Sequence, residues 1–316
     1  MRREEAAADP RRGSDGGRPH LDFHSDLDDY FAAKALLFTP AYTQIGVVNI
    51  DDAYGRQLTA RPQIPITTFS ANGDPAADWR AVDVRAGADG SAFRVIGPGG
   101  VEADASVALP GPFNVANALG AVVALVEAGI GLATAVAGIA ACPGVPGRLE
   151  RFGPPEGPGV FVDYAHTPAA ITQALAALET LNFSRLITVF GCGGDRDRTK
   201  RPLMGAAAAA GSQLVIITSD NPRTEDPLAI IREIEPGVSH CGRPRLDAAA
   251  AQRGEAGYLV VPDRREAIRL AVSLARPGEA VLVAGKGHEN YQIWGAERRH
   301  FDDREEVAQA LAEYHG

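Results

Sequence analysis

The chain has 316 residues, which is enough for two domains that each bury a hydrophobic core. Its 40 acidic residues outnumber its 31 basic residues, and the formal net charge of −9 argues against a protein that mainly binds nucleic acid. Hydrophobic residues make up 45% of the chain but form no run that could span a bilayer, so we expect no membrane partner. The three cysteines are scattered and no apolar signal segment follows the N-terminal arginines, which favours the reducing cytoplasm.

The first half of the chain has the pattern of a mixed α/β region behind a polar N-terminus. Residues 1–19 are rich in Arg, Asp, Gly and Pro, and we expect them to be disordered. The Pro/Gly segment 142–147 ends this region and is the predicted domain boundary. Hydrophobic spacing between these segments predicts helices over 26–38, 52–60, 113–128 and 133–141, strands over 46–50 and 66–70, and a β-meander over 79–109.

After the boundary, apolar strands alternate with helices. The predicted strands are 160–164, 185–190, 213–219, 258–261 and 280–285, and the predicted helices are 168–181, 201–210, 227–234, 263–275 and 303–314. Strands that are apolar on both faces, each followed by a helix, indicate a mostly parallel sheet covered on both sides. The sequence therefore predicts a Rossmann-like α/β domain.

Polar motifs follow four of these strands. They are DYAHTP at 163–168, FGCGGDRDRTKRP at 190–202, SDNPRTEDP at 219–227 and GKGHE at 285–289. Each could be a turn or a helix cap when taken alone. Because ligands of open parallel sheets bind beyond the carboxyl ends of the strands, the four loops together predict one site.

The charges in two of these loops suggest the ligand. Asp220 lies close to Arg223, and Arg196 lies between Asp195 and Asp197. A carboxylate suits an ammonium group and a guanidinium fork suits a carboxylate, so the loops favour a zwitterion such as an amino acid.

Lysine is scarce in this chain. Of the 31 basic residues only Lys34, Lys200 and Lys286 are lysines, and all three fall in motif-like segments. Because ammonium and guanidinium groups are not interchangeable, these positions are candidates for specific roles, although the distribution could also be chance.

Two asparagines and an arginine near the boundary are further candidates. Asn114 could cap the helix predicted at 113–128, whereas Asn117, inside that apolar helix, needs a partner. Arg148 could be a linker charge or a phosphate ligand.

Eight segments in order make the chain similar to the Mur ligases, the ATP-dependent amino acid ligases of peptidoglycan precursor synthesis. These segments are HLDFHSDLDDYFAAKALLF, VVNIDDAYG, GPFNVANALGA, GRLERF, DYAHTP, FGCGGDRDRTKRPLMG, SDNPRTEDP and GKGHENYQ. DNPR with GKGHE resembles the branch that adds meso-diaminopimelate to UDP-N-acetylmuramoyl-L-alanyl-D-glutamate. The resemblance implies an incomplete central P-loop-type ATPase domain over 20–144, followed over 145–316 by a Rossmann-like, amino-acid-binding domain with a mostly parallel sheet.

The resemblance also implies roles for individual residues. It implies ATP and Mg²⁺ as cofactors, small-molecule substrates, and a monomer. In this family ATP converts a carboxylate to an acyl phosphate, which the incoming amine attacks. The implied roles are catalysis by Lys34, Asp163, His166 and Lys200; magnesium binding by His20 and by Lys34 as its carbamate; ATP binding by Asn117, Arg148 and Asp163; and diaminopimelate binding by Arg196, Asp220, Asn221, Pro222, Arg223, Gly285 and Glu289.

Two family features are missing from the 316 residues. These residues contain neither the family's UDP-binding domain nor a GxxxxGK[ST] loop, so we expect a sheet with an unpaired edge strand. Three hypotheses follow. The chain is the C-terminal part of a diaminopimelate ligase, either as an inactive fragment or as a sequence with a misassigned start. Alternatively, it is a module that only binds an amino acid, or an amide ligase for another acceptor.

Overall fold

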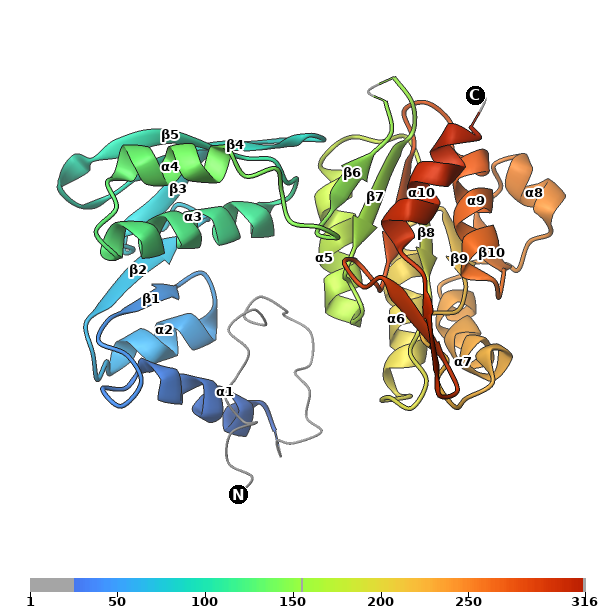
Figure 1. Cartoon of the computed structure of the whole chain (residues 1–316), viewed down its shortest axis with the longest axis horizontal. Helices are drawn as coiled ribbons and strands as arrows, with labels where there is room; N and C mark the ends of the chain where they lie inside the picture. The colour runs from blue at the N-terminus through green and yellow to red at the C-terminus, as the bar shows by residue number, and fades with distance from the viewer. Residues whose placement is uncertain (1–25, 155, 315–316) are drawn as a thin grey trace. The chain divides into compact units, whose positions relative to one another are not determined.

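A computed structural model describes residues 26–154 and 156–314, which form two compact units (Figure 1). The division falls between Pro143 and Gly144. The expectation of disorder over 1–19, and the candidate ligand His20, lie outside the described residues. Within the described ranges no helix is both long and apolar enough to cross a membrane.

The N-terminal unit contains a five-stranded mixed sheet. Its strands lie in the order β1-β2-β3-β4-β5, with the first three parallel and the last two antiparallel, as the predicted meander requires. The described strands give β1 only one neighbour, so it forms an edge of this sheet. The bounds are β1 (Gly46–Asn49), β2 (Ile66–Ser70), β3 (Trp79–Gly87), β4 (Gly90–Ile96) and β5 (Glu102–Val107).

Helices α3 (Pro112–Glu127) and α4 (Leu132–Ala140) pack on this sheet and close its core, which includes Val95 and Leu119. The long helix expected over 26–38 is α1 (Leu27–Ala35), which continues as a 3₁₀ turn at Leu36–Phe38. Helix α2 (Ala53–Ala60) follows β1.

The proposed helix cap in this unit was wrong. Gly111, not Asn114, is the N-cap of α3, and Asn114 instead donates from Nδ2 to the carbonyl of Pro110 at 2.8 Å. The helix begins earlier than predicted because Pro112 suits the first helical position, where its missing N–H has no partner to lose.

The C-terminal unit is the predicted doubly wound α/β domain. Its six-stranded sheet has the order β10-β9-β8-β11-β7-β6, and all pairs are parallel except β6 with β7. The bounds are β6 (Glu150–Phe152), β7 (Gly159–Asp163), β8 (Leu186–Phe190), β9 (Leu214–Ile217), β10 (Gly257–Val260) and β11 (Ala280–Ala284). Strands β7, β8, β9 and β11 are buried along their whole length, which explains their continuous apolar runs.

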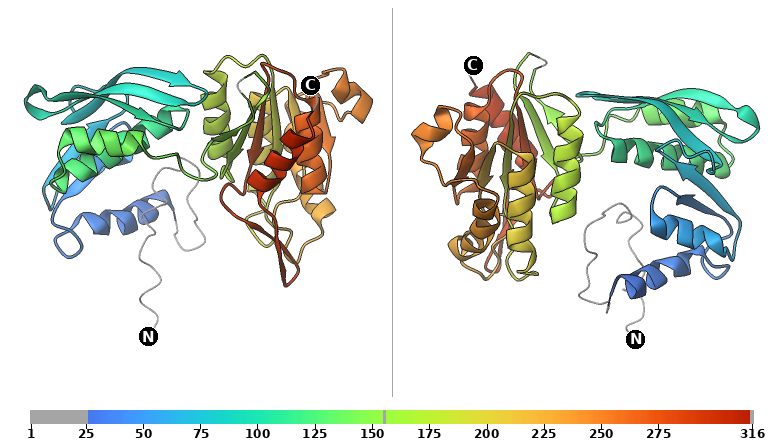
Figure 2. Two further views of the ribbon diagram at one scale, coloured as in Figure 1. Left: turned by 45° about the horizontal axis from the view of Figure 1, so that its top comes forward. Right: turned by 180° about the vertical axis from the view of Figure 1, so that it is seen from behind.

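Helices cover both faces of this sheet (Figures 1 and 2). One face carries α5 (Pro168–Glu179), α6 (Lys200–Gly211) and α7 (Pro227–His240), and the other carries α9 (Arg264–Leu274) and α10 (Asp303–Ala312).

Four features of the C-terminal unit escaped sequence reasoning. Three are short: β6, helix α8 (Ala248–Gln252), and the hairpin of β12 (Tyr291–Trp294) and β13 (Glu297–His300). The fourth is the length of α7, which continues through Pro236 to His240 although the prediction ended at 234. Ile230, Ile234 and Val238 bury one continuous face of this helix, and that packing outweighs the hydrogen bond lost at the proline.

Candidate functional site

The four polar loops meet at one edge of the C-terminal sheet. The order β9-β8-β11-β7 places the four preceding strands side by side, and their parallel register brings their carboxyl ends together. The convergence expected from the sequence is therefore present in the fold.

Two glycines of the loop after β8 allow it to touch the loop after β9. A Cβ on Gly191 would lie 2.3 Å from the carbonyl oxygen of Thr218, and one on Gly194 would lie 1.9 Å from that of Pro222. The N–H of Gly194 donates to the carbonyl of Asn221 at 2.9 Å. These glycines are thus required by contact between two neighbouring loops and not only by a tight turn.

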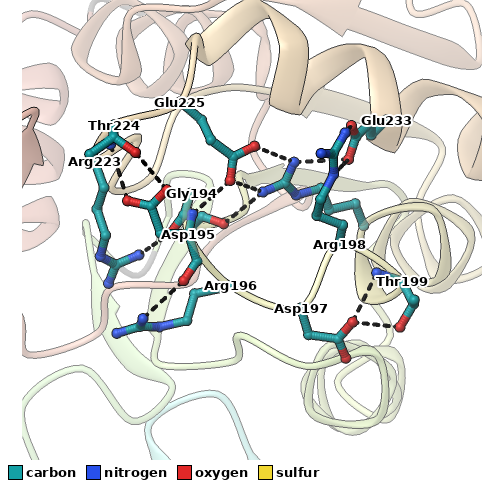
Figure 3. Close-up of polar contacts among 12 residues, drawn as sticks. Gly194, Asp195, Arg196, Asp197, Arg198, Thr199, Arg223, Thr224, Glu225 and Glu233 are labelled. Carbon is teal, nitrogen blue, oxygen red and sulfur yellow. Dashed lines mark hydrogen bonds and ion pairs between the residues drawn. The ribbon is translucent and has the colours of Figure 1, made fainter. Parts of the chain in front are cut away.

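Arg196 and Arg223 come from these two loops and lie close together (Figure 3). Arg196 is exposed and donates from Nη1 to the carbonyl of Asp195 at 3.0 Å, while Arg223 is half-buried and donates from Nη1 to the carbonyl of Gly194 at 2.7 Å. Gly193 lies between them, because a Cβ there would be 2.8 Å from Arg223 Nη1 and 3.6 Å from Arg196 Cγ. Two guanidinium groups that make only carbonyl contacts can still bind a carboxylate.

An ion-pair network around the buried Arg201 holds the arginine loops in place (Figure 3). Arg201 is 1% exposed and pairs with Glu225 at 2.7 Å and with Glu233 at 2.8 Å, while Arg198 forms a second pair with Glu233. Glu225 also accepts from the backbone N–H of Asp195 at 2.6 Å. The hydrogen bond from Arg201 lowers the pKa of Glu225 to about 2, so this network is charged throughout the neutral range.

The two carboxylates that flank Arg196 have partners within the loops. Asp195 accepts from the hydroxyl of Thr224 at 2.7 Å, and Asp197 accepts from the hydroxyl of Thr199 at 2.6 Å. Both carboxylates are therefore already engaged in hydrogen bonds within the loops.

Two further carboxylates of the rim lie around Lys286. Lys286 Nζ lies 3.2 Å from Asn221 Oδ1, 3.5 Å from Glu289 Oε2 and 4.0 Å from Asp220 Oδ1. Gly285 has a φ of +119°, and a Cβ there would lie 2.7 Å from Asp220 Oδ2, so only glycine leaves room beside this carboxylate. Asp220, Asn221, Gly285 and Glu289, predicted as substrate ligands, are thus brought together.

A second cluster forms on the same unit where Gly147 meets the GKGHE loop. A Cβ on Gly147 would lie 2.3 Å from the backbone nitrogen of His288. The ring of Tyr164 lies 5.0 Å from the ring of His288 and 4.6 Å from that of His166, and the Arg148 guanidinium stands 5.0 Å above it. Aromatic rings beside a cation can hold a flat, anionic ligand.

The other predicted residues are more dispersed. The Asp163 carboxylate accepts from the backbone N–H groups of Leu149 and Ala165, each at 2.8 Å. Lys200 is half-buried at the start of α6 and has no ion pair among the described residues.

In the N-terminal unit, Asn117 is exposed on α3, and the partner that its apolar sequence context called for is Asn114, to which it donates at 3.4 Å. Lys34 lies on α1 with Nζ 4.6 Å from the centre of the Tyr30 ring.

Three buried cations of this rim, Lys286, Arg201 and Arg264, received no substrate-binding or catalytic role from the sequence. Lys286 stood out as one of three scarce lysines, and Arg201 lies in the FGCGGDRDRTKRP motif, where Lys200 next to it received the role instead. Arg264 is fully buried against Asp303 and donates to the carbonyls of Ser219 and Ala284, directly before the DNPR and GKGHE loops. No sequence motif marked it.

Two sequence families match this chain. Residues 17–125 match the Mur ligase middle domain, and residues 147–287 match the Mur ligase glutamate ligase domain. The chain belongs to the Mur ligase family. Together the two matches account for most of its length, and they fall on either side of the division between the structural units.

Curated relatives in this family are identical to the chain at close to half of the aligned positions. The UDP-N-acetylmuramoyl-L-alanyl-D-glutamate--2,6-diaminopimelate ligase of Streptomyces avermitilis is 50% identical over 94% of this chain and 57% of its own length. The protein of the same name from Geobacter sulfurreducens is 45% identical over 93% of this chain and 59% of its own length. The Mur ligase chain described here therefore spans less than two thirds of these relatives.

Solved structures of Mur ligases have the same fold. A structure titled as UDP-N-acetylmuramoyl-L-alanyl-D-glutamate--2,6-diaminopimelate ligase aligns over 95% of this chain and 59% of its own, with 38% identity and a TM-score of 0.59. A UDP-N-acetylmuramate-alanine ligase from Thermotoga maritima aligns over 93% of this chain and 57% of its own, with 17% identity and a TM-score of 0.63, which supports the fold alone.

Proposed function

We propose that this chain is part of an ATP-dependent ligase that adds meso-diaminopimelate to UDP-N-acetylmuramoyl-L-alanyl-D-glutamate in peptidoglycan precursor synthesis. The observation that carries the proposal is the presence, on one rim, of two guanidinium groups, from Arg196 and Arg223, and of two carboxylates, from Asp220 and Glu289. The names of the curated relatives point to the same acceptor.

The rim would bind the acceptor amino acid by charge. Arg223, with Arg196 beside it, would hold the carboxylate on the distal carbon of diaminopimelate, which L-lysine lacks. Asp220 and Glu289 would hold an ammonium group. Pro222 and Gly285 would shape the pocket, since glycine alone leaves space next to Asp220.

For the nucleotide we propose roles for Arg148 and Asp163 in the C-terminal unit and, separately, for Asn117 in the N-terminal unit. The Asp163 carboxylate is held by the backbone N–H groups of Leu149 and Ala165, and a carboxylate is a suitable acceptor for ribose hydroxyls. Arg148 has no ion pair among the described residues, so its charge is available to a phosphate. His166 and Lys200 would act beside the reacting groups. When bound, ATP supplies the activation of the carboxylate as an acyl phosphate.

We propose that Lys34, as its carbamate, and His20 bind magnesium. His20 lies outside the described residues, and over 26–154 and 156–314 no group of three or more His, Cys, Asp and Glu side chains could hold a metal ion. Complete loss of activity in Lys34→Ala, in the intact ligase, is the expected result.

The experiment that tests the substrate is a calorimetric titration of the full chain with meso-diaminopimelate and with L-lysine. One lost charge-assisted hydrogen-bond partner corresponds to about 1.5–3 kcal/mol, or about ten- to a hundredfold in affinity. We expect L-lysine to bind that much more weakly, and Arg223→Ala to remove the difference. Arg232→Ala, which loses an exposed arginine of α7 paired with Asp226, is the matched control. Equal affinities for both amino acids would refute the substrate.

The second candidate function is a module that binds the amino acid without turning over ATP. It is favoured by one observation: all the side chains of the acceptor rim lie in the C-terminal unit, which is compact and has its own hydrophobic core. Binding of meso-diaminopimelate without ADP release in the presence of ATP, magnesium and UDP-dipeptide would support it. The third hypothesis, another acceptor, would be favoured by acceptance of L-lysine or by an Arg223→Ala change with no effect on acceptor affinity. For each of these we propose a cytoplasmic monomer, which sedimentation would test.

A further inference from the structure

Lys286 is the most enclosed charged side chain of the rim. It is fully buried, at the end of β11, and it is one of only three lysines in the chain. An unpaired ammonium group in a protein interior is strongly unfavourable, so its surroundings must compensate its charge. Its relative exposure of 0% also means that it cannot touch a bound amino acid directly.

The partners of Lys286 are side chains already assigned to the acceptor pocket. Nζ donates to Asn221 Oδ1 at 3.2 Å and lies 3.5 Å from Glu289 Oε2 and 4.0 Å from Asp220 Oδ1. The ring of Tyr291 covers it at 5.5 Å. One ammonium group therefore faces two carboxylates, which leaves the cluster with a single net negative charge.

Lys286 also determines the orientation of the Asn221 amide. Asn221 Oδ1 accepts from Lys286 Nζ and, at 3.0 Å, from the backbone N–H of Ile293 in β12. With both lone pairs of the oxygen used, Nδ2 points at Glu289 Oε2 and donates to it at 3.1 Å. The lysine thereby aims Glu289 through the amide as well as through its own charge.

The β12–β13 hairpin also holds the DNPR loop, through hydrogen bonds to the loop's backbone. Arg223 donates from its backbone N–H to the carbonyl of Ile293 at 3.0 Å, and Gln292 Nε2 donates to the carbonyl of Asp220 at 3.0 Å. The backbone of the DNPR loop is thus held by the hairpin, and its Asn221 side chain is held by Lys286.

We propose that Lys286 is a positioning residue of the acceptor pocket: its ammonium group orients the Asn221 amide and, directly and through that amide, the Glu289 carboxylate that would hold the ligand's ammonium group. This inference rests on the proposed function, because it assigns Lys286 to the same amino acid site. It predicts an effect on affinity that is separate from any effect on folding.

The test is calorimetric titration of the full chain and of its Lys286→Met variant with meso-diaminopimelate and with L-lysine. We expect Lys286→Met to weaken both ligands by at least about tenfold and by a similar factor, because both carry the ammonium group that this cluster faces. Arg223→Ala, in contrast, should weaken meso-diaminopimelate alone. Lys286→Arg, which keeps a cation, should recover part of the loss.

The control for a general loss of stability is Arg185→Met. Arg185 is also buried and is paired with Glu279 at 3.6 Å, where β8 and β11 begin, at the opposite end of the sheet from the rim. The Arg185→Met variant should have a lower unfolding temperature, and its ligand affinity should stay within twofold of that of the unaltered chain. If Lys286→Met does not fold, Lys286→Gln takes its place with the same expected loss.

Three outcomes would decide between the hypotheses. Unchanged affinity in a folded Lys286 variant would overturn the positioning role and leave the proposed function standing. An equal loss of affinity in Arg185→Met would also overturn it, because the effect would then follow stability. Failure of the unaltered chain to bind meso-diaminopimelate would instead refute the substrate proposal itself.

Discussion

Replacing Arg264 with methionine should be among the most destabilising single changes in the C-terminal unit. Arg264 and Asp303 are fully buried and join the start of α9 to the start of α10 through two hydrogen bonds of 2.7 Å each. The same guanidinium donates to the carbonyls of Ala284 at 2.9 Å and of Ser219 at 3.4 Å. Methionine preserves most of the volume but leaves Asp303 as an isolated buried charge.

The expected size follows from that isolated charge. Removing one partner of a buried, hydrogen-bonded pair costs about 3–5 kcal/mol, a large part of the about 5–15 kcal/mol by which a native domain is stable. At about 2–4 °C per kcal/mol for a unit of this size, the unfolding temperature should fall by about 6–20 °C.

The matched control is an arginine of an exposed ion pair in the same unit. Arg232 of α7 pairs with Asp226 at 3.4 Å, and the two side chains are 63% and 57% exposed. Arg232→Met should therefore cost only about 0–1 kcal/mol. Urea unfolding followed by circular dichroism measures both variants. Similar losses in the two, or a loss below about 1 kcal/mol for Arg264→Met, would refute the reasoning.

Three further results are expected. Gly193→Ala should weaken meso-diaminopimelate binding about tenfold at nearly unchanged stability, because the new methyl group displaces the flexible end of Arg223; calorimetry and thermal unfolding measure the two effects. Arg201 lowers the pKa of Glu225 to about 2, so the contribution of Glu225 to stability is complete above pH about 4.5 and is lost as the pH falls towards 2. The free energy of unfolding of Glu225→Gln, measured by urea titrations, should therefore fall less steeply over this acidic range. Burial raises the pKa of Cys192, so maleimide should label it far more slowly than the two exposed cysteines, as followed by mass spectrometry.

Each of these expectations has a contrary outcome. Full affinity in Gly193→Ala would mean that the Arg223 position is not set by the space at Gly193. If the free energy of unfolding falls equally steeply with acid for the unaltered protein and for Glu225→Gln, the Arg201–Glu225 ion pair does not contribute to acid stability. Equal labelling rates for all three cysteines would mean that Cys192 is accessible in the native state.

Local sequence determined the elements and the place of the site. Strands β7, β8, β9 and β11 were predictable because a strand buried on both faces needs an uninterrupted apolar run, and helices between them need a 3.6-residue period. The four polar loops follow those strands directly. Since parallel strands bring equivalent ends to one edge, the rim could be located before any side-chain position was known.

Tertiary structure alone decided how the rim is held. Gly191 and Gly194 are needed because a neighbouring strand's loop passes within contact distance, which no local pattern reveals. Within the apolar helix α3, Asn114 is buried and Asn117 is exposed, because the face that a helix buries depends on what packs against it. The sequence marks Lys286 as one of three scarce lysines but does not show its partners, and Arg264 looks like an ordinary surface charge. Their roles arise from partners 65 and 39 residues away, and contacts at such separations are set by the topology of the sheet.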